Sequence, residues 1–119
     1  MFRLALIFVV LIIYGSLFPF TGWSGPQAPM FAFLFTWSET IGKADLIQNL
    51  LAYAPLGLFL VLWLKRSARA RHAVGIAIAA GTGLSLAMES VQQFLPARVS
   101  SNADLAMNVL GTLAGALLA

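Results

Sequence analysis

The stretch LIQNLLAYAPLGLFLVLWL, residues Leu46–Leu64, decides the fold class, because it runs for 19 residues without a charged side chain. A helix needs roughly 20 mostly apolar residues to cross the hydrocarbon core of a bilayer. Comparable apolar runs extend over Leu4–Phe18, Ala73–Leu95 and Leu105–Ala119. The sequence therefore predicts an all-α membrane protein with four transmembrane helices in a single domain, residues 1–119.

Composition supports this prediction and excludes several classes of function. Of the 119 residues 61% are hydrophobic and 9% charged, whereas a soluble domain carries about 45–50% apolar and about 25% charged residues. Cysteine is absent and His72 is the single histidine, so we expect no disulfide, metal or cofactor site. The net charge of +3 comes from few basic residues beside apolar runs, which argues against nucleic-acid binding. The partner that we expect is the lipid bilayer.

The distribution of basic residues predicts the orientation in the membrane. In the predicted topology one side carries five of them: Arg3, Lys65, Arg66, Arg69 and Arg71. The other side has only Lys43 and Arg98. The positive-inside rule then places both termini in the cytoplasm, in a multi-pass protein of the inner or plasma membrane. A cleaved signal peptide is the alternative for the first run, but no A-x-A-like site follows it and the next segment stays apolar.

The outer connection between the first two helices contains an aromatic segment, MFAFLFTW at residues 30–37. It is too short to span a bilayer and too apolar to be an ordinary solvated loop. We favour an aromatic anchor at the membrane interface. The alternative is a lid over a site in the outer leaflet.

A short repeat relates the second and fourth helices. The sequence ADLIQNLL at residues 44–51 recurs as ADLAMNVL at residues 103–110, 59 residues later. Each copy follows a helix that we expect to end at an apolar residue and a proline, Phe18-Pro19 and Leu95-Pro96. Two helix hairpins in a parallel repeat would explain this pattern, and chance similarity in a biased composition is the alternative.

The polar residues of three predicted helices form one stripe on each helix. The stripes are Asp45, Asn49 and Tyr53; Thr82, Ser85, Glu89 and Gln92; and Asp104 and Asn108. Inserting an ionisable side chain near the membrane centre costs roughly 2.5–3.5 kcal/mol. Such residues therefore indicate a structural or functional role. All three stripes reach the same outer-leaflet depth, which predicts a polar pocket open to the outside. The ligand-binding residues that we expect are Asn49, Glu89, Gln92, Arg98, Asp104 and Asn108.

Each of these residues also has a structural interpretation. Asp45 and Asp104 lie in predicted first helical turns, where a carboxylate stabilises the helix by about 0.3–1 kcal/mol, and Ser101-Asn102-Ala103-Asp104 fits a capping box. We favour capping for the aspartates. Asn49 and Asn108 fit hydrogen bonds between helices as well as they fit a ligand role.

Glu89 is harder to explain structurally, because a carboxylate inside the membrane either pairs with a cation or is protonated. We expect Arg98 to lie near it, and the sequence leaves open whether Arg98 pairs with Glu89 or with Asp104. The GxxxG step Gly111–Gly115 should let another backbone approach closely, as should Gly57, Gly81 and Gly83.

Four stretches of the chain resemble the VanZ-like family of small bacterial membrane proteins. They are NLLAYAPLG at 49–57, LSLAMESVQ at 84–92, Arg98, and DLAMNVLG at 104–111. The resemblance implies that Glu89, Gln92, Arg98, Asp104 and Asn108 form the characteristic polar set, whereas many relatives have histidine at the position of Asn49. The family is named for an accessory protein that gives low-level resistance to teicoplanin, and most relatives occur without resistance clusters.

We expect the protein to bind a cell-envelope component, such as a lipid-linked precursor headgroup, or to alter the exposure of that component. Glu89 and Asp104 would orient hydroxyls or amines, the amides would supply hydrogen bonds, and Arg98 would contact phosphate. One alternative is a membrane enzyme in which Glu89 is the acid or base and Asp104 its partner. Another is a structural assembly partner, in which the GxxxG face docks a second protein.

Overall fold

The computed structural model describes residues 1–26, 28–35 and 42–119. Over these ranges all the regular secondary structure is helical and there is no β-strand, which confirms the all-α prediction. It forms four α-helices and two short 3-10 turns: α1 (Phe2–Leu17), η1 (Ala32–Leu34), α2 (Lys43–Leu64), η2 (Ala70–His72), α3 (Ala73–Gln92) and α4 (Asn102–Leu118). Thr36 and Trp37, the end of the aromatic segment, lie outside the described ranges.

Two of the helical stretches are long and apolar enough to cross a membrane, α2 and Ala70–Gln92. The other two helices, α1 and α4, have 16 and 17 residues, which correspond to about 24 and about 26 Å at about 1.5 Å per residue. By length and composition, two of the four helices therefore qualify as membrane-spanning segments.

The third helix ends earlier than the sequence predicts, at Gln92 instead of Leu95. The amides of Phe94 and Leu95 donate to the carbonyls of Val91 and Gln92 in tight three-residue turns. Pro96 explains the early end, because a proline disfavours the helical conformation of the residue before it. The connection 93–101 is therefore longer than expected.

The fourth helix includes the polar first turn, since it begins at Asn102 with Ser101 as its cap. The Ser101 hydroxyl accepts hydrogen bonds from the amides of Ala103 and Asp104 at 3.1 and 3.2 Å. These bonds satisfy two of the four amides that lack an intrahelical partner at a helix start.

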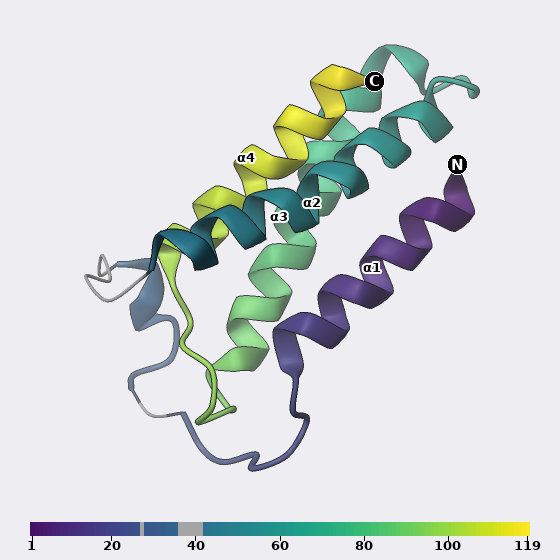
Figure 1. Ribbon diagram of the computed structural model, residues 1–119. Coiled ribbons are helices and arrows are strands. Elements are labelled where there is room, and N and C mark those ends of the chain that lie inside the picture. Colours follow the sequence, from purple (N-terminus) through teal and green to yellow (C-terminus); the bar gives the residue numbers. More distant parts are fainter. Residues whose placement is uncertain (27, 36–41) are drawn as a thin grey trace.

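The two copies of the repeat lie side by side, because α2 and α4 run parallel and share the largest interface of the bundle (Figure 1). A Cβ on Gly111 would meet the carbonyl oxygen of Leu50, and one on Gly115 would meet that of Ala54. At the far end Lys65 Nζ donates to the main-chain oxygen of Ala119 at 2.6 Å. The GxxxG step thus packs inside the bundle against α2, which confirms the expected close backbone approach and uses this face within the chain itself.

Helix α3 packs on α4 and α2, and α1 packs mainly on α2. Gly81 faces the side chain of Thr112, whereas a Cβ on Gly83 would meet nothing within 4 Å, so the expectation of a close approach at Gly83 is wrong. Figure 1 shows both chain ends at one end of the bundle, near the connection between α2 and α3. The described residues between α1 and α2 and the connection 93–101 lie at the opposite end.

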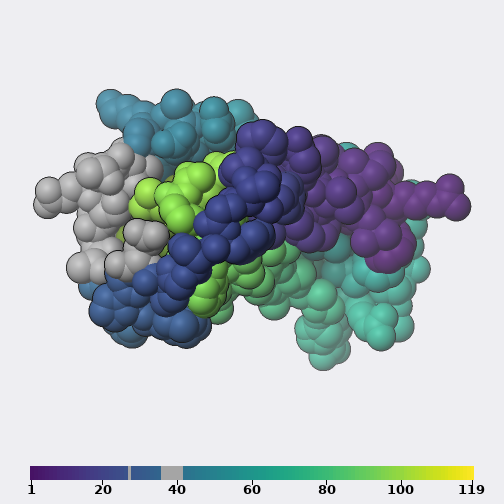
Figure 2. All heavy atoms as spheres, turned by 90° about the horizontal axis from the view of Figure 1, so that it is seen from below, coloured from purple at the N-terminus to yellow at the C-terminus, as the bar shows by residue number. Residues whose placement is uncertain are grey.

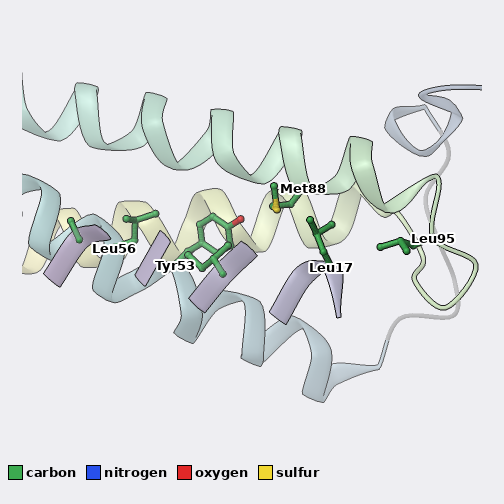
Figure 3. Packing of buried hydrophobic residues seen from close by; sticks show 7 residues of the cluster. Leu17, Tyr53, Leu56, Met88 and Leu95 are labelled. Atoms are coloured by element: carbon green, nitrogen blue, oxygen red, sulfur yellow. The ribbon is translucent and has the colours of Figure 1, made fainter. Parts of the chain in front are cut away.

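The largest apolar cluster joins α1, α2 and α3, and Tyr53 lies within it (Figure 3). Its buried members are Ala5, Ile12, Leu17, Tyr53, Leu56, Met88 and Leu95. A second cluster fills the other end of the bundle: Val61, Leu64, Ala73, Ala77 and Ala116. The outer face of α1, by contrast, exposes large apolar side chains such as Ile7 and Val10, as expected for a helix that faces lipid.

The described part of the aromatic segment, residues 30–35, lies over the end of α3. Phe33 is buried, whereas Phe35 is 87% exposed. The amide of Phe31 donates to Oε1 of Gln93 at 2.7 Å, and the amide of Ser24 donates to the carbonyl of Phe94 at 2.9 Å. The segment therefore covers the α3–α4 connection, while Phe35 remains available to its surroundings.

Candidate functional site

A cavity of about 520 Å³ lies at the end of the bundle that carries the long connections. All six residues expected from the sequence line it: Asn49, Glu89, Gln92, Arg98, Asp104 and Asn108. Apolar residues of α1, among them Phe8, Leu11 and Ile12, form another wall. In Figure 2 atoms near residue 100 are visible at the surface between the end of α1 and the start of α2.

A hydrogen bond between α2 and α4 crosses the site. Asn49 Nδ2 donates to Oδ1 of Asp104 at 2.8 Å. Asp104 lies in the first turn of α4, but its carboxylate does not complete the expected capping box, because the amide of Ser101 bonds elsewhere. Helix α2 has Gly42 as its cap, and no side chain bonds its first amides within the described residues. Both aspartates lie in first helical turns, as expected for a carboxylate that stabilises a helix start, and both line the cavity; among the described residues neither bonds an amide of its own first turn.

Glu89 joins α3 to the start of α4 and is only 3% exposed. Its Oε2 accepts a hydrogen bond from the amide of Ser101 at 2.8 Å. The hydroxyl of Ser100 donates to the main-chain oxygen of Glu89 at 2.6 Å. One carboxylate oxygen is thus held by the turn that begins α4, and the side chain lines the cavity with α3 as its support.

Arg98 does not pair with Glu89 or Asp104, and both versions of that expectation are wrong. Its guanidinium donates instead to two main-chain oxygens at the end of α1, from Nε to Phe18 and from Nη2 to Gly15, each at 2.8 Å. The carbonyls at the end of a helix lack intrahelical partners and carry partial negative charge. Arg98 therefore fastens the end of α1 to the α3–α4 connection.

Gln92 reinforces this attachment, because its Nε2 donates to the main-chain oxygen of Ser16 at 2.8 Å. Its Oε1 is buried and has no hydrogen-bond partner among the described residues. Asn108 behaves similarly: its Nδ2 donates to the Ser85 hydroxyl at 2.8 Å, and its buried Oδ1 has no partner in the described ranges. Both amides thus leave an acceptor unused at the cavity.

Several lining residues were not among the six expected from the sequence. Asp45 and Tyr53 belong to the polar stripe of α2, so their spacing of four and eight residues around Asn49 is the pattern that finds them. Gln48 and Ser101 also line the cavity. The role of the Ser101 amide toward Glu89 has no sequence signature, because it depends on the path of the connection.

A second cavity of about 340 Å³ adjoins the first and is covered by the aromatic segment. Its lining includes Ala28 and Phe33 on one side and Gln93 and Ser100 on the other. Arg98 lines both cavities. Within its described part, the segment lines this second cavity through Ala32 and Phe33 and does not line the main one, so both the membrane anchor and the lid stay predictions.

The donor set of the main cavity favours binding by hydrogen bonds and charge. Neither histidine nor lysine lines it, and the described residues contain no group of three or more acidic or histidine side chains placed to hold a metal ion. Carboxylates and amides supply acceptors and donors for a polar group. The apolar wall of α1 completes an amphipathic cavity.

Comparison with known proteins gives one match. No curated protein and no solved structure matches the chain. The family model VanZ/LLP1 matches residues 2–119, which cover all four helices and every residue that lines the cavity. The chain therefore belongs to the VanZ/LLP1 family.

Proposed function

We propose that this protein crosses the cytoplasmic membrane four times, with both ends of the chain in the cytoplasm. The basic residues Lys65, Arg66, Arg69 and Arg71 flank the same end of the bundle as the two chain ends, as the positive-inside rule requires. The long axis of the molecule is 44 Å, close to the about 40–45 Å of a bilayer with its headgroups. In this orientation the cavity opens in the outer leaflet.

We propose further that the cavity binds an amphiphilic component of the cell envelope and alters its exposure. The observation that supports this is the convergence of six polar residues, from three helices and the connection 93–101, on one cavity beside an apolar wall. Headgroup contacts would come from Glu89, Asp104 and the amides, and chain contacts from α1. A lipid-linked precursor has this composition of polar head and apolar tail.

The polar groups around Glu89 support binding. Oε2 of Glu89 accepts the Ser101 amide, so an acid-base role would fall to Oε1 alone. The unused acceptors of Gln92 and Asn108 fit recognition of a headgroup.

Co-purification tests the proposal. We expect wild-type protein, extracted gently from its own membranes, to retain an envelope amphiphile that mass spectrometry identifies. Glu89→Gln and Asn108→Leu should lose it, because both remove acceptors from the cavity. Gly83→Ala is the matched control, since its Cβ meets nothing within 4 Å. Equal retention by wild type and both cavity variants would refute a binding role.

The family resemblance extends the proposal to antibiotic sensitivity. If the bound component takes part in glycopeptide action at the cell surface, a strain that depends on this protein should become more sensitive to teicoplanin when Glu89→Gln replaces the wild type. The change should not occur with Gly83→Ala. Unchanged sensitivity with Glu89→Gln would refute the link to teicoplanin. The binding of an envelope component would then still be decided by the co-purification experiment.

A further inference from the structure

We infer that the cavity selects an amphiphile whose headgroup carries a primary ammonium group. This inference rests on the proposed function and names the ligand chemistry of the same site. It follows from three properties of the cavity: its charge, the kind of hydrogen-bonding groups left unused, and its size.

The cavity is rich in acidic residues, whereas the chain as a whole is basic. The protein has four Asp and Glu residues and a net charge of +3, yet Asp45, Glu89 and Asp104 all line this cavity. Asp104 lies within electrostatic range of both other carboxyls. Arg98 is the only Lys or Arg among the described lining residues, and two of its donors are already bonded to carbonyls of α1. The lining therefore gathers three of the chain's four side-chain carboxyl groups where a headgroup would lie.

Of the unused hydrogen-bonding groups that the described residues place at the cavity, two are amide acceptors and the third is the hydroxyl of Tyr53, which can accept as well as donate. Asn108 is 3% exposed, and its buried Oδ1 lacks a partner within the described residues, as does the buried Oε1 of Gln92. Each amide nitrogen already donates one hydrogen bond, to the Ser85 hydroxyl and to the Ser16 carbonyl respectively. A buried acceptor without a partner costs about 1–3 kcal/mol. A ligand that donates several hydrogen bonds would satisfy these groups, and a primary ammonium has three donors and no acceptor.

The size and spacing of the lining favour an organic cation over a metal ion. In the described part of the chain no three acidic or histidine side chains are close enough to hold one ion. The cavity of about 520 Å³ also includes Phe8, Leu11 and Ile12, and apolar residues of this kind contact alkyl chains and not hydrated ions. Carboxylates in a poorly hydrated site are stabilised by a cation that is itself bound there.

Lipid competition measured by native mass spectrometry tests the inference. Purified protein in a mild detergent is offered equal amounts of phosphatidylethanolamine and phosphatidylglycerol with the same acyl chains, which differ in the ammonium group. We expect the ethanolamine lipid to be retained in about tenfold excess, as a charge-assisted hydrogen bond implies. Dodecylammonium should compete with it, whereas free ethanolamine should not if the alkyl chain contributes. No preference, or a preference for the glycerol lipid, would overturn the inference.

Two variants test whether the preference for the ethanolamine lipid depends on the cavity. Asp104→Asn should reduce it strongly, and Asp45→Asn should reduce it with little effect on folding, because Asp45 is exposed at the start of α2. Ser90→Ala on α3 is the control, since its hydroxyl bonds only the Leu86 carbonyl of its own helix. If Asp104→Asn or Asp45→Asn keeps the preference, the inference fails. If wild type binds both lipids equally and Glu89→Gln loses both, the proposed binding function stands and the ammonium selectivity is refuted.

Discussion

The side-chain amide of Asn49 donates a 2.8 Å hydrogen bond to the carboxylate of Asp104, which lies in the other copy of the internal repeat. The repeat places Asn108 where the first copy has Asn49 and Asp104 where it has Asp45. The reciprocal bond, from Asn108 to Asp45, is not formed, because Asn108 donates to Ser85 on α3. The equivalent asparagines of the two copies therefore make different contacts: Asn49 bonds α2 to α4, and Asn108 bonds α4 to α3.

A double-mutant cycle on Asn49→Ala and Asp104→Ala should show a coupling of about 0.6 kcal/mol, and up to about 1.7 kcal/mol, as measured for hydrogen bonds between membrane helices. The measurement is the free energy of unfolding in a bilayer mimic. Gln48→Ala paired with Asp104→Ala is the control, since Gln48 lines the cavity without a hydrogen bond to Asp104. Zero coupling for Asn49 and Asp104 would show that the bond adds nothing to stability.

Gly115→Ala should destabilise the bundle by about 1–3 kcal/mol, because the new Cβ would overlap the carbonyl oxygen of Ala54 and force α2 and α4 apart. Gly111→Ala should act similarly against the Leu50 carbonyl. The measurement is again the free energy of unfolding. Gly83→Ala and Gly75→Ala are controls, since their Cβ atoms meet nothing within 4 Å, and alanine favours a helix over glycine. If all four variants behave alike, the close α2–α4 approach is wrong.

Arg98→Gln should release the end of α1, because both guanidinium bonds, to the carbonyls of Gly15 and Phe18, are lost. Arg98→Lys should restore only part of the attachment, since an ammonium lacks the planar fork that serves two oxygens at once. Amide hydrogen exchange over residues 12–20 is the measurement, with faster exchange expected in the order wild type, Lys, Gln. Arg66→Gln, at the other end of the bundle, should leave exchange there unchanged. Equal protection in Arg98→Gln and wild type would contradict this role for Arg98.

Much of the fold and the location of the site could be predicted from the sequence, because both depend on patterns repeated along helices. The spacing of Asp45, Asn49, Glu89 and Asn108 places each polar group on one face of its helix, and helices in a small bundle have few faces to turn inward. The GxxxG step likewise indicated a close helix contact. The family resemblance and the residue pattern agreed on the same positions.

The partners of the charged groups could not be predicted, because they depend on connections with no periodic pattern. Arg98 lies in the connection 93–101, whose path is set by the early end of α3 before Pro96. That path directs the guanidinium to α1 and the Ser101 amide to Glu89. The prediction that Arg98 pairs with a carboxylate rested on charge alone. It did not consider the carbonyls at the end of α1, which lack intrahelical partners and accept both guanidinium bonds.

The predicted four-span topology is open to a direct test, because the chain contains no cysteine and single cysteines report accessibility without background. Gly25→Cys lies in the connection after α1, and Ala68→Cys lies between α2 and α3; both positions are exposed. In intact cells a membrane-impermeant maleimide should label Gly25→Cys and not Ala68→Cys, which should react only after the membrane is broken. Cysteine-free wild type is the blank, and labelling of both variants in opened membranes shows that each thiol is reactive. The reverse pattern would place the cavity on the cytoplasmic side, which would contradict recognition of an outer-leaflet component while leaving the geometry of the cavity intact.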